Sequence, residues 1–404
     1  MYMNIEEFLN KIHINIDEIV SVNNLYKRKE FGEVFTPNIL ISKMLELIPI
    51  DFLKDKNMKW LDPCVGIGNF TILIVELLMK HIDIEDENER YKHIMENMIY
   101  VCDVQDNSIE MFKSFFSRDG IELNIYNGSF LDIDDNDVRY DIIVANPPYN
   151  GSTDDNKTNG NIIWDEFVIK SINISDRLLF VHPSIWRKPL TKNSKVKDIL
   201  SLFKTRNLKY LNINGLDEGK RIFGAGTRFD YYYLDNSKYD GTIVNDENNN
   251  EYIIDIMEYD FIPNFDIVNI YNSFKGVGLD VIFNSSYHSV RDYVSDVSNS
   301  EFKYPLIHST PKKGIVYKYS NINNKGHFGI SKVIIGESGV DNLVIDIDGI
   351  YGMTQGAIGI VVNDIGEALV LEKFFKSERF EKIRKCCSWS NFRIDANLIK
   401  KLVI

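Results

Sequence analysis

The clearest pattern in the chain is an apolar run that stops abruptly at a polar tetrapeptide. Residues 142–145 are all apolar, and Asn146, Pro147, Pro148 and Tyr149 follow at once. A continuous run of mostly β-branched residues predicts a strand covered on both faces. Two consecutive prolines cannot donate to a sheet, so the strand must end there. We therefore expect Asn146 and Tyr149 at the carboxyl end of a buried strand, where open α/β sheets bind ligands.

The same pattern of strand, polar end and helix repeats along the first half of the chain. Upstream strands are expected at residues 58–61, 98–102 and 122–126, and later ones at 178–181, 208–213 and 228–234. Strands that alternate with helices predict a Rossmann-like, doubly wound, mostly parallel sheet, here of seven strands. Because parallel strands end at one edge, Asp62, Asp103 and Ser129 should lie near Asn146.

A change in composition suggests where one domain gives way to another. Residues 235–251 are rich in Asn and Asp, and the segment after them alternates short apolar runs with turns. We expect an N-terminal helix packed on the core at 1–25, a catalytic domain at 26–240 and a β-rich α+β domain at 241–404. Within the last domain a single helix is expected at 367–385.

Composition narrows the class of protein. The chain has 404 residues, 44% hydrophobic and 26% charged, as in globular proteins with two sizeable cores. We see no membrane-spanning apolar run and no secretion signal, and the four cysteines lack metal-ligand spacing. We therefore expect an intracellular protein with no metal site and no membrane partner. His308 and His327 are interpreted as ordinary surface or turn histidines.

The net charge of −13 argues against nucleic acid as a partner unless positive charge is concentrated locally. The helix expected at 367–385 offers such a concentration. Its candidate phosphate contacts are Lys373, Lys376, Arg379 and Lys382. A solvated helix face explains the same residues equally well.

The tetrapeptide at the end of the buried strand suits methylation of an exocyclic amino group. Such an amine is a poor nucleophile because its lone pair is delocalised. The side-chain oxygen of Asn146 and the carbonyl of Pro147 could accept both N–H bonds and favour a tetrahedral nitrogen. Tyr149 offers a flat face for a planar base. The alternative is a Pro-Pro turn in which Asn146 only caps a loop.

A second set of residues suits an amino-acid-like cofactor. Gly66 and Gly68 lie between a strand and a helix and would let the backbone approach a ligand, although two glycines alone are weak evidence. Asp62 could pair with an ammonium group, and Asp103 is placed as an acceptor for ribose hydroxyls. Thr36 precedes Pro37 as a helix entry and would also lie against the ligand.

Taken in order, these segments resemble the gamma-class adenine-N6 DNA methyltransferases of type II restriction-modification systems. The resemblance rests on Gly-Glu-Val-Phe-Thr-Pro at 32–37, Asp-Pro-Cys-Val-Gly-Ile-Gly-Asn-Phe at 62–70, Asp103, and Asn-Pro-Pro-Tyr at 146–149. In that family the catalytic domain precedes a target-recognition domain. The resemblance implies methyl transfer from S-adenosyl-L-methionine to N6 of an adenine flipped out of duplex DNA.

The resemblance also implies roles for individual residues. Asn146, Pro147, Pro148 and Tyr149 would be catalytic. The cofactor would contact Phe35, Thr36, Asp62, Cys64, Gly66, Gly68, Asp103, Ser129 and Phe130. Ser129 is a departure, because the family often has an acidic residue there, and Asp132 three residues later is the other candidate. Phe223 is most simply a packing residue, yet it could stack on the other face of the base.

Several alternatives stay open at this stage. The same tetrapeptide serves enzymes that methylate RNA, a protein glutamine or cytosine N4, and a catalytically idle DNA-binding subunit would keep the fold. No nuclease segment is recognisable before residue 32. The resemblance implies double-stranded DNA as the partner. Because the chain shows no nuclease segment there, a separately encoded cognate restriction endonuclease is a second candidate partner. Neither the DNA recognition sequence nor the oligomeric state follows from the sequence.

Overall fold

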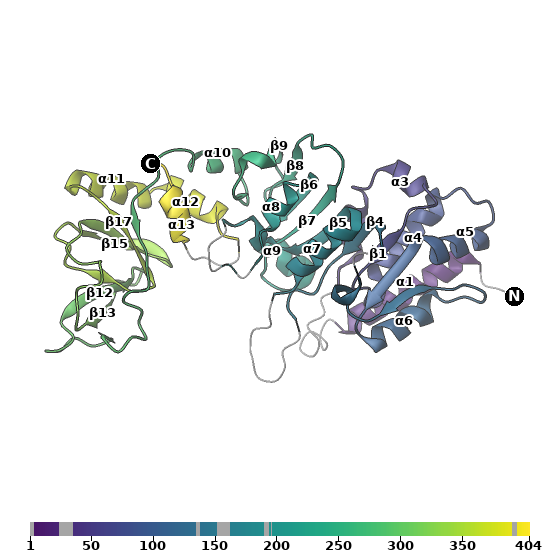
Figure 1. Cartoon of the computed structure of the whole chain (residues 1–404), viewed down its shortest axis with the longest axis horizontal. Coiled ribbons are helices and arrows are strands. Elements are labelled where there is room, and N and C mark those ends of the chain that lie inside the picture. Colours follow the sequence, from purple (N-terminus) through teal and green to yellow (C-terminus); the bar gives the residue numbers. More distant parts are fainter. Residues whose placement is uncertain are drawn as a thin grey trace. The chain divides into compact units, whose positions relative to one another are not determined.

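The chain forms two compact units in this computed structural model (Figure 1). The structure describes residues 4–23, 35–134, 138–151, 162–189, 194, 196–389 and 394–404. The first unit comprises Met1–Trp186 and Asn193–Glu258, and the second comprises Arg187–Lys192 and Tyr259–Ile404. The boundary expected at residue 240 therefore lies at residue 258 instead.

The first unit is built on a mixed sheet in which the described residues form nine strands, in the order β3-β2-β1-β4-β5-β7-β6-β8-β9. β1 to β5 are parallel, and β7 runs antiparallel to both of its neighbours. The strands are β1 Trp60–Asp62, β2 Ile99–Asp103, β3 Asn124–Asn127, β4 Tyr140–Ala145, β5 Ser175–Pro183, β6 Asn207–Asn214, β7 Phe229–Asp235, β8 Thr242–Asn245 and β9 Glu251–Ile254. This confirms the expected fold class.

Helices pack on this sheet and exclude water from its centre (Figure 1). They are α1 Ile5–Asn23, α2 Asn38–Leu45, α3 Ile50–Lys54, α4 Asn69–His81, α5 Glu87–His93, α6 Asp106–Phe116, α7 Trp164–Ile174, α8 Ile199–Phe203 and α9 Leu216–Phe223. Residues 142–145 of β4 are 0% exposed, which explains why the strand carries no polar face. The apolar side of α1, including Ile12 and Ile16, belongs to the same core.

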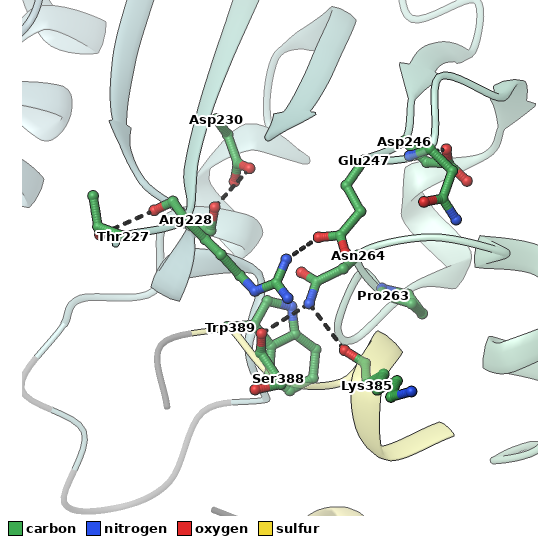
Figure 2. A network of polar contacts seen from close by, with 12 residues as sticks. Thr227, Arg228, Asp230, Asp246, Glu247, Pro263, Asn264, Lys385, Ser388 and Trp389 are labelled. Carbon is green, nitrogen blue, oxygen red and sulfur yellow. Dashed lines mark hydrogen bonds and ion pairs between the residues drawn. The ribbon is translucent and has the colours of Figure 1, made fainter. Parts of the chain in front are cut away.

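The expectation of seven strands was wrong because the Asn/Asp-rich segment is not a linker. β8 pairs with β6 and β9 pairs with β8, so both strands extend the first sheet. Asp246 fixes the turn between them by accepting the backbone N–H groups of Asn248 and Asn250, each at 2.9 Å. A mostly buried ion pair between Arg228 and Glu247 joins this turn to the start of β7 (Figure 2).

The described part of the second unit contains two four-stranded sheets, in the orders β10-β17-β14-β15 and β11-β13-β12-β16. The strands are β10 Val281–Ile282, β11 Val294–Ser295, β12 Tyr304–Ser309, β13 Val316–Ser320, β14 Lys332–Gly336, β15 Gly339–Asp346, β16 Gly352–Met353 and β17 Ala357–Val361. The helices are α10 Ile267–Asn272, α11 Ile365–Phe375, α12 Glu378–Cys386 and α13 Ala396–Lys401. The unit is β-rich and α+β, as expected.

The single helix expected at 367–385 is two helices, α11 and α12. The break falls at Ser377, whose side chain accepts the backbone N–H of Phe380 and so begins the second helix. Apolar residues continue at helical spacing across the break, with Phe375 and Phe380 in edge contact. The continuous periodicity therefore concealed the start of α12. Ser377 could have indicated it, because serine is a favoured N-cap residue.

Buried polar side chains organise the second unit. Asn264 is 0% exposed and donates to the carbonyls of Lys385 and Ser388 (Figure 2). The guanidinium of Arg187, also 0% exposed, donates to the carbonyl of Ile262 at 2.9 Å and to Oδ1 of Asn264 at 2.9 Å. Residues more than a hundred positions apart are thereby fixed to one another.

Among the described residues no helix combines the length and the apolar character that a membrane span requires.

Candidate active site

The loop between β1 and α4 has the conformation that its glycines predict. Gly66 and Gly68 have φ angles of 52° and 96°, in the left-handed region that glycine adopts readily. A Cβ on Gly68 would lie 2.6 Å from the ring of Phe116, so a side chain is excluded there by packing. A Cβ on Gly66 would meet no atom within 4 Å. The backbone at Gly66 therefore borders open space.

Backbone hydrogen bonds join the ends of β1, β2 and β3 into one edge. The N–H of Val65 donates to the carbonyl of Cys102 at 3.0 Å, and the N–H of Gly128 donates to that of Asp103 at 2.9 Å. The carboxylate of Asp103 accepts the N–H of Gly66 at 2.9 Å. The expected convergence of Asp62, Asp103 and the glycine loop is thus observed.

Two carboxyl groups are buried next to the glycine loop. Asp62 is 5% exposed and Asp103 is 8% exposed. Burial, with a smaller contribution from the nearby charge of Asp103, raises the pKa of Asp62 to about 7. Burial also raises the pKa of Asp103, although the N–H groups of Gln105 and Gly66 oppose this shift. Among the ion pairs of the described residues, none includes Asp62 or Asp103.

These features fit a ligand that carries a positive charge and approaches the backbone closely. Gly66 provides the space, and Asp62 and Asp103 provide the negative charge. Asn69, at the start of α4, adds a buried Oδ1 that has no hydrogen-bond partner in the described part of the chain. S-adenosylmethionine has an ammonium, a sulfonium and ribose hydroxyls, so the residues present fit it.

The tetrapeptide at the end of β4 lies against this loop. Nδ2 of Asn146 donates to Oγ1 of Thr36 at 2.9 Å, and Sγ of Cys64 donates to the carbonyl of Asn146 at 3.4 Å. Nδ2 of Asn69 donates to the carbonyl of Thr36 at 3.2 Å. Phe35 packs half-buried on the core. Residues from three separate segments of the sequence, 35–36, 64–69 and 146, thus meet at one point.

Within the tetrapeptide the two prolines have different surroundings, since Pro147 is buried and Pro148 is exposed. The hydroxyl of Tyr149 is buried and has no hydrogen-bond partner within the described ranges. Burial raises the pKa of Tyr149, so the phenol is neutral at every physiological pH. The carbonyl of Tyr149 accepts the N–H of Ile163 at 3.3 Å, which fixes the backbone after the tetrapeptide.

Ser129 and Phe130 follow β3, as expected. Oγ of Ser129 accepts the N–H of Leu131 at 3.2 Å and so begins a short 3-10 helix, whereas Asp132 is exposed. Phe130 is 1% exposed and packs against Phe167, with ring centroids 5.3 Å apart. Ser129 therefore caps this short helix, and Phe130 packs in the core.

Sequence reasoning missed an aromatic group at the end of β5. The ring of His182 is fully buried, stacks on Trp164 with centroids 4.1 Å apart, and its Nε2 lies 3.2 Å from the hydroxyl of Tyr232. Burial lowers the pKa of His182 to about 3, so the ring is neutral. His182 follows an apolar run and directly precedes a proline, as Asn146 does. This pattern could have indicated that His182 lies at the end of a buried strand.

Two predictions about other residues are changed by the structure. Phe223 is 2% exposed and makes edge contact with Phe229 in the core, with centroids 4.9 Å apart, so its ring packs and does not offer a face for stacking. In the second unit, Lys376 pairs with Glu372 at 2.7 Å and Lys382 pairs with Asp266 at 2.5 Å. The positive charge expected on α11 and α12 is thus partly neutralised.

Some predicted features lie outside the described residues. They are positions 32–34 of the Gly-Glu-Val-Phe-Thr-Pro segment on which the resemblance partly rests.

The sheet order and the loop between β1 and α4 define the first unit as a Rossmann-like α/β fold. Residues 18–184 match the N-6 DNA methylase family model. This match agrees with the adenine-N6 methyltransferase resemblance stated from the sequence. No curated protein sequence matches the chain significantly.

Solved structures resemble the chain in fold at low sequence identity. The type ISP restriction-modification enzyme LlaGI, as a nuclease-deletion mutant with a DNA substrate mimic, is 12% identical with a TM-score of 0.56 over 93% of this chain and 46% of that one. The type IIL enzyme MmeI in complex with DNA is 11% identical with a TM-score of 0.51, over 98% and 69%.

A modification subunit of a putative type I restriction enzyme from Vibrio vulnificus YJ016 is 16% identical, with a TM-score of 0.47 over 61% of this chain and 53% of that one. The chain thus spans about half the length of such subunits.

Proposed function

We propose that this chain is a site-specific DNA methyltransferase that transfers a methyl group from S-adenosylmethionine to N6 of an adenine flipped out of duplex DNA. The observation that carries the proposal is the meeting of the buried Asp62 and Asp103 carboxyl groups with Asn146 through Thr36 and the glycine loop. The match of residues 18–184 to the N-6 DNA methylase family supports it.

The cofactor would be held by the edge formed by β1, β2 and β3. Asp62 would pair with its ammonium, Asp103 would accept from its ribose hydroxyls, and the backbone at Gly66 would lie against it. When bound, S-adenosylmethionine supplies an electrophilic methyl group on a sulfonium. Phe35, Thr36 and Asn69 would close the other side, and Cys64, Ser129 and Phe130 would shape the pocket.

Asn146 is oriented for its role by Thr36. Because Nδ2 of Asn146 already donates to Oγ1 of Thr36, the opposite end of the amide is the oxygen, which is the acceptor that an N6–H donor requires. The carbonyl of Pro147 would accept the second N–H. Together they would shift the nitrogen lone pair out of conjugation and towards the methyl group, which is stabilisation of the transition state by fixed dipoles.

Tyr149 would bind the flipped base by stacking. Its phenol stays neutral because burial raises its pKa, so it serves as a flat face rather than as a base. Pulling the adenine from the duplex costs a few kcal/mol, which stacking and contacts to the base edge offset. A proton acceptor before methyl transfer is unnecessary, because the proton can leave after the nitrogen has become cationic.

The second unit, near the 241–404 range first expected, would select the target sequence in duplex DNA. A separately encoded restriction endonuclease is a candidate partner, and the site of action would be intracellular, where the target DNA resides.

The proposal is tested by sequencing that detects modified bases, on DNA from cells that express the chain or its Asn146→Ala variant. We expect methyladenine at one short motif with the unaltered chain and none with Asn146→Ala, although that variant still binds S-adenosylmethionine. Asn97→Ala, at an exposed position in the helical turn Ile94–Met98 that precedes β2, should methylate normally. Unmodified DNA from the unaltered chain, together with intact cofactor binding, would overturn the DNA substrate in favour of RNA or protein.

A further inference from the structure

Charge is divided unevenly along the chain. Residues 259–404 contain 17 Lys and Arg against 16 Asp and Glu, whereas residues 1–258 contain 29 against 43. The acidity of the protein therefore belongs almost entirely to the first 258 residues. A polyanion is repelled least by the second unit, so its contact surface is best sought there.

The hairpin between β12 and β13 presents positive charge in the second unit. Lys312 and Lys313 lie at its turn and are both exposed, and Gly314, with a φ of 127°, closes the turn. Among the described ion pairs of this unit, none includes Lys312 or Lys313, in contrast to Lys376 and Lys382. The positive charge of the hairpin is thus available to a partner, whereas the positive charge of α11 and α12 is partly neutralised by ion pairs.

The base of this hairpin is fixed. Thr310 is 0% exposed, and its Oγ1 donates to the carbonyl of Gly339 at 2.8 Å and accepts the N–H of Gly336 at 2.7 Å. Nδ2 of Asn342 donates to the carbonyl of Pro311 at 2.6 Å. These bonds tie the turn to β14 and β15. Binding through Lys312 and Lys313 would therefore cost little ordering of the backbone.

Phenol groups continue the surface along β13. Tyr317, three residues beyond Gly314, is 39% exposed, and its ring lies 6.2 Å from that of Tyr351. Tyrosine hydroxyls and lysine ammonium groups are both common donors to phosphate oxygens in protein–DNA contacts. A fixed turn with two exposed lysines, followed along β13 by an exposed tyrosine, therefore matches the chemistry of a nucleic-acid backbone.

We propose that the β12–β13 hairpin, through Lys312, Lys313 and Tyr317, docks the second unit on the phosphate backbone of duplex DNA. This inference rests on the proposed function, because it names the surface by which the DNA substrate is bound. It also replaces α11 and α12 as the main phosphate-binding element. The hairpin positions the protein on the duplex and does not read bases.

The test measures binding of the full chain to a fluorescent duplex that contains the methylation motif, over a range of salt concentrations. The double variant Lys312→Ala/Lys313→Ala should bind about tenfold more weakly near 0.1 M salt, with a slope of log affinity against log salt that is smaller by about 2. In methylation assays KM for DNA should rise by a similar factor, with kcat unchanged. Tyr317→Phe, which removes one hydroxyl, should weaken binding less.

Two charge-matched controls accompany this variant. Lys54→Ala/Lys56→Ala removes the same charge from exposed positions of the first unit and should leave the slope unchanged. Lys373→Ala/Arg379→Ala removes it from α11 and α12 and should have a smaller effect than the hairpin variant.

The outcomes separate this inference from the proposed function. If the unaltered chain methylates DNA but the hairpin variant keeps the full salt slope, or the helix variant loses more, the inference is overturned and the function stands. If the chain binds DNA through the hairpin but methylates none, the surface stands and the function falls. A chain that neither binds nor methylates DNA overturns both.

Discussion

At the scale of single residues, the most informative group is the carboxyl of Asp62. A buried carboxyl without a cationic partner is costly to ionise, and its pKa of about 7 expresses that cost. Core positions are usually apolar. Two buried carboxyl groups at one sheet edge, Asp62 and Asp103, are therefore typical of a site that binds a cation rather than of a structural ion pair.

This carboxyl predicts how cofactor binding depends on pH. Ionised Asp62 is the form that pairs with an ammonium, so affinity for S-adenosylmethionine should rise about tenfold between pH 5.5 and 7. Calorimetric titration over this window measures it. Asp62→Asn should bind weakly with no such rise, and a rise that persists in this variant would assign the dependence to another group.

The same raised pKa makes the ligand-free chain less stable as the pH rises, whereas it makes cofactor binding stronger. Because the folded pKa of Asp62 exceeds its ordinary value of 3.8, the folded state holds more protons than the unfolded state between these two values. The contribution to the free energy of unfolding is therefore greatest below pH 3.8 and is lost as the pH rises to about 7. The site thus costs stability at neutral pH that the bound cofactor would restore.

At the scale of elements, the loop between β1 and α4 separates two uses of glycine. Gly68→Ala should lower the free energy of unfolding by about 2 kcal/mol, because the new Cβ meets Phe116 and the left-handed backbone is strained. Gly66→Ala should cost only about 1 kcal/mol, because its Cβ meets no atom. Denaturant titration compares the two variants.

Gly68→Ala should lose more stability, whereas Gly66→Ala should lose more affinity for the cofactor. The Cβ at Gly66 enters the space that we assign to S-adenosylmethionine, so binding should fall at least tenfold in a variant that folds almost normally. Normal binding by Gly66→Ala would place the cofactor elsewhere.

The sequence was sufficient for strands whose pattern is unambiguous. β4 is apolar throughout and ends at two prolines, so both its burial and its end could be predicted. β8 and β9 could not, because each has four residues and the turn between them is rich in Asn and Asp, as a linker would be. β8 joins the sheet by pairing with β6, about thirty residues earlier, and β9 joins it by pairing with β8. No local pattern encodes the pairing of β8 with β6.

For the candidate site, residue types at strand ends were enough to predict that Asp62, Asp103 and Asn146 lie at one edge of the sheet. They were not enough for Asn69, His182 or Phe223, whose roles depend on side-chain packing across elements. Asn69 lies inside a motif that drew attention to its glycines, and its bond to Thr36 joins segments 33 residues apart. Such contacts follow from the tertiary fold and not from spacing.

At the scale of the whole molecule, each unit should respond to its own ligand or mutation. All proposed cofactor contacts belong to the first unit, so S-adenosylmethionine should raise the unfolding temperature of that unit, by mass action, and leave the other unchanged. Asn264→Ala should lower the stability of the second unit alone, by about 3 kcal/mol, because it leaves buried partners unsatisfied.

Differential scanning calorimetry with and without cofactor checks this prediction. Asn264→Asp is the matched comparison. It keeps the oxygen that accepts from Arg187 and removes the donor to the carbonyls of Lys385 and Ser388. A single transition that moves as one in all cases would show that the units unfold together and would contradict the prediction.

The path of the chain through Arg187 limits how the second unit could be exchanged for that of another protein. The chain enters the second unit at Arg187–Lys192, returns to the first, and enters again at Tyr259. A recombination event that replaced only residues 259–404 would remove the carbonyls of Ile262 and Pro263 from around the Arg187 guanidinium. A transplanted second unit must therefore either supply the same carbonyls or bring its own version of the short upstream segment.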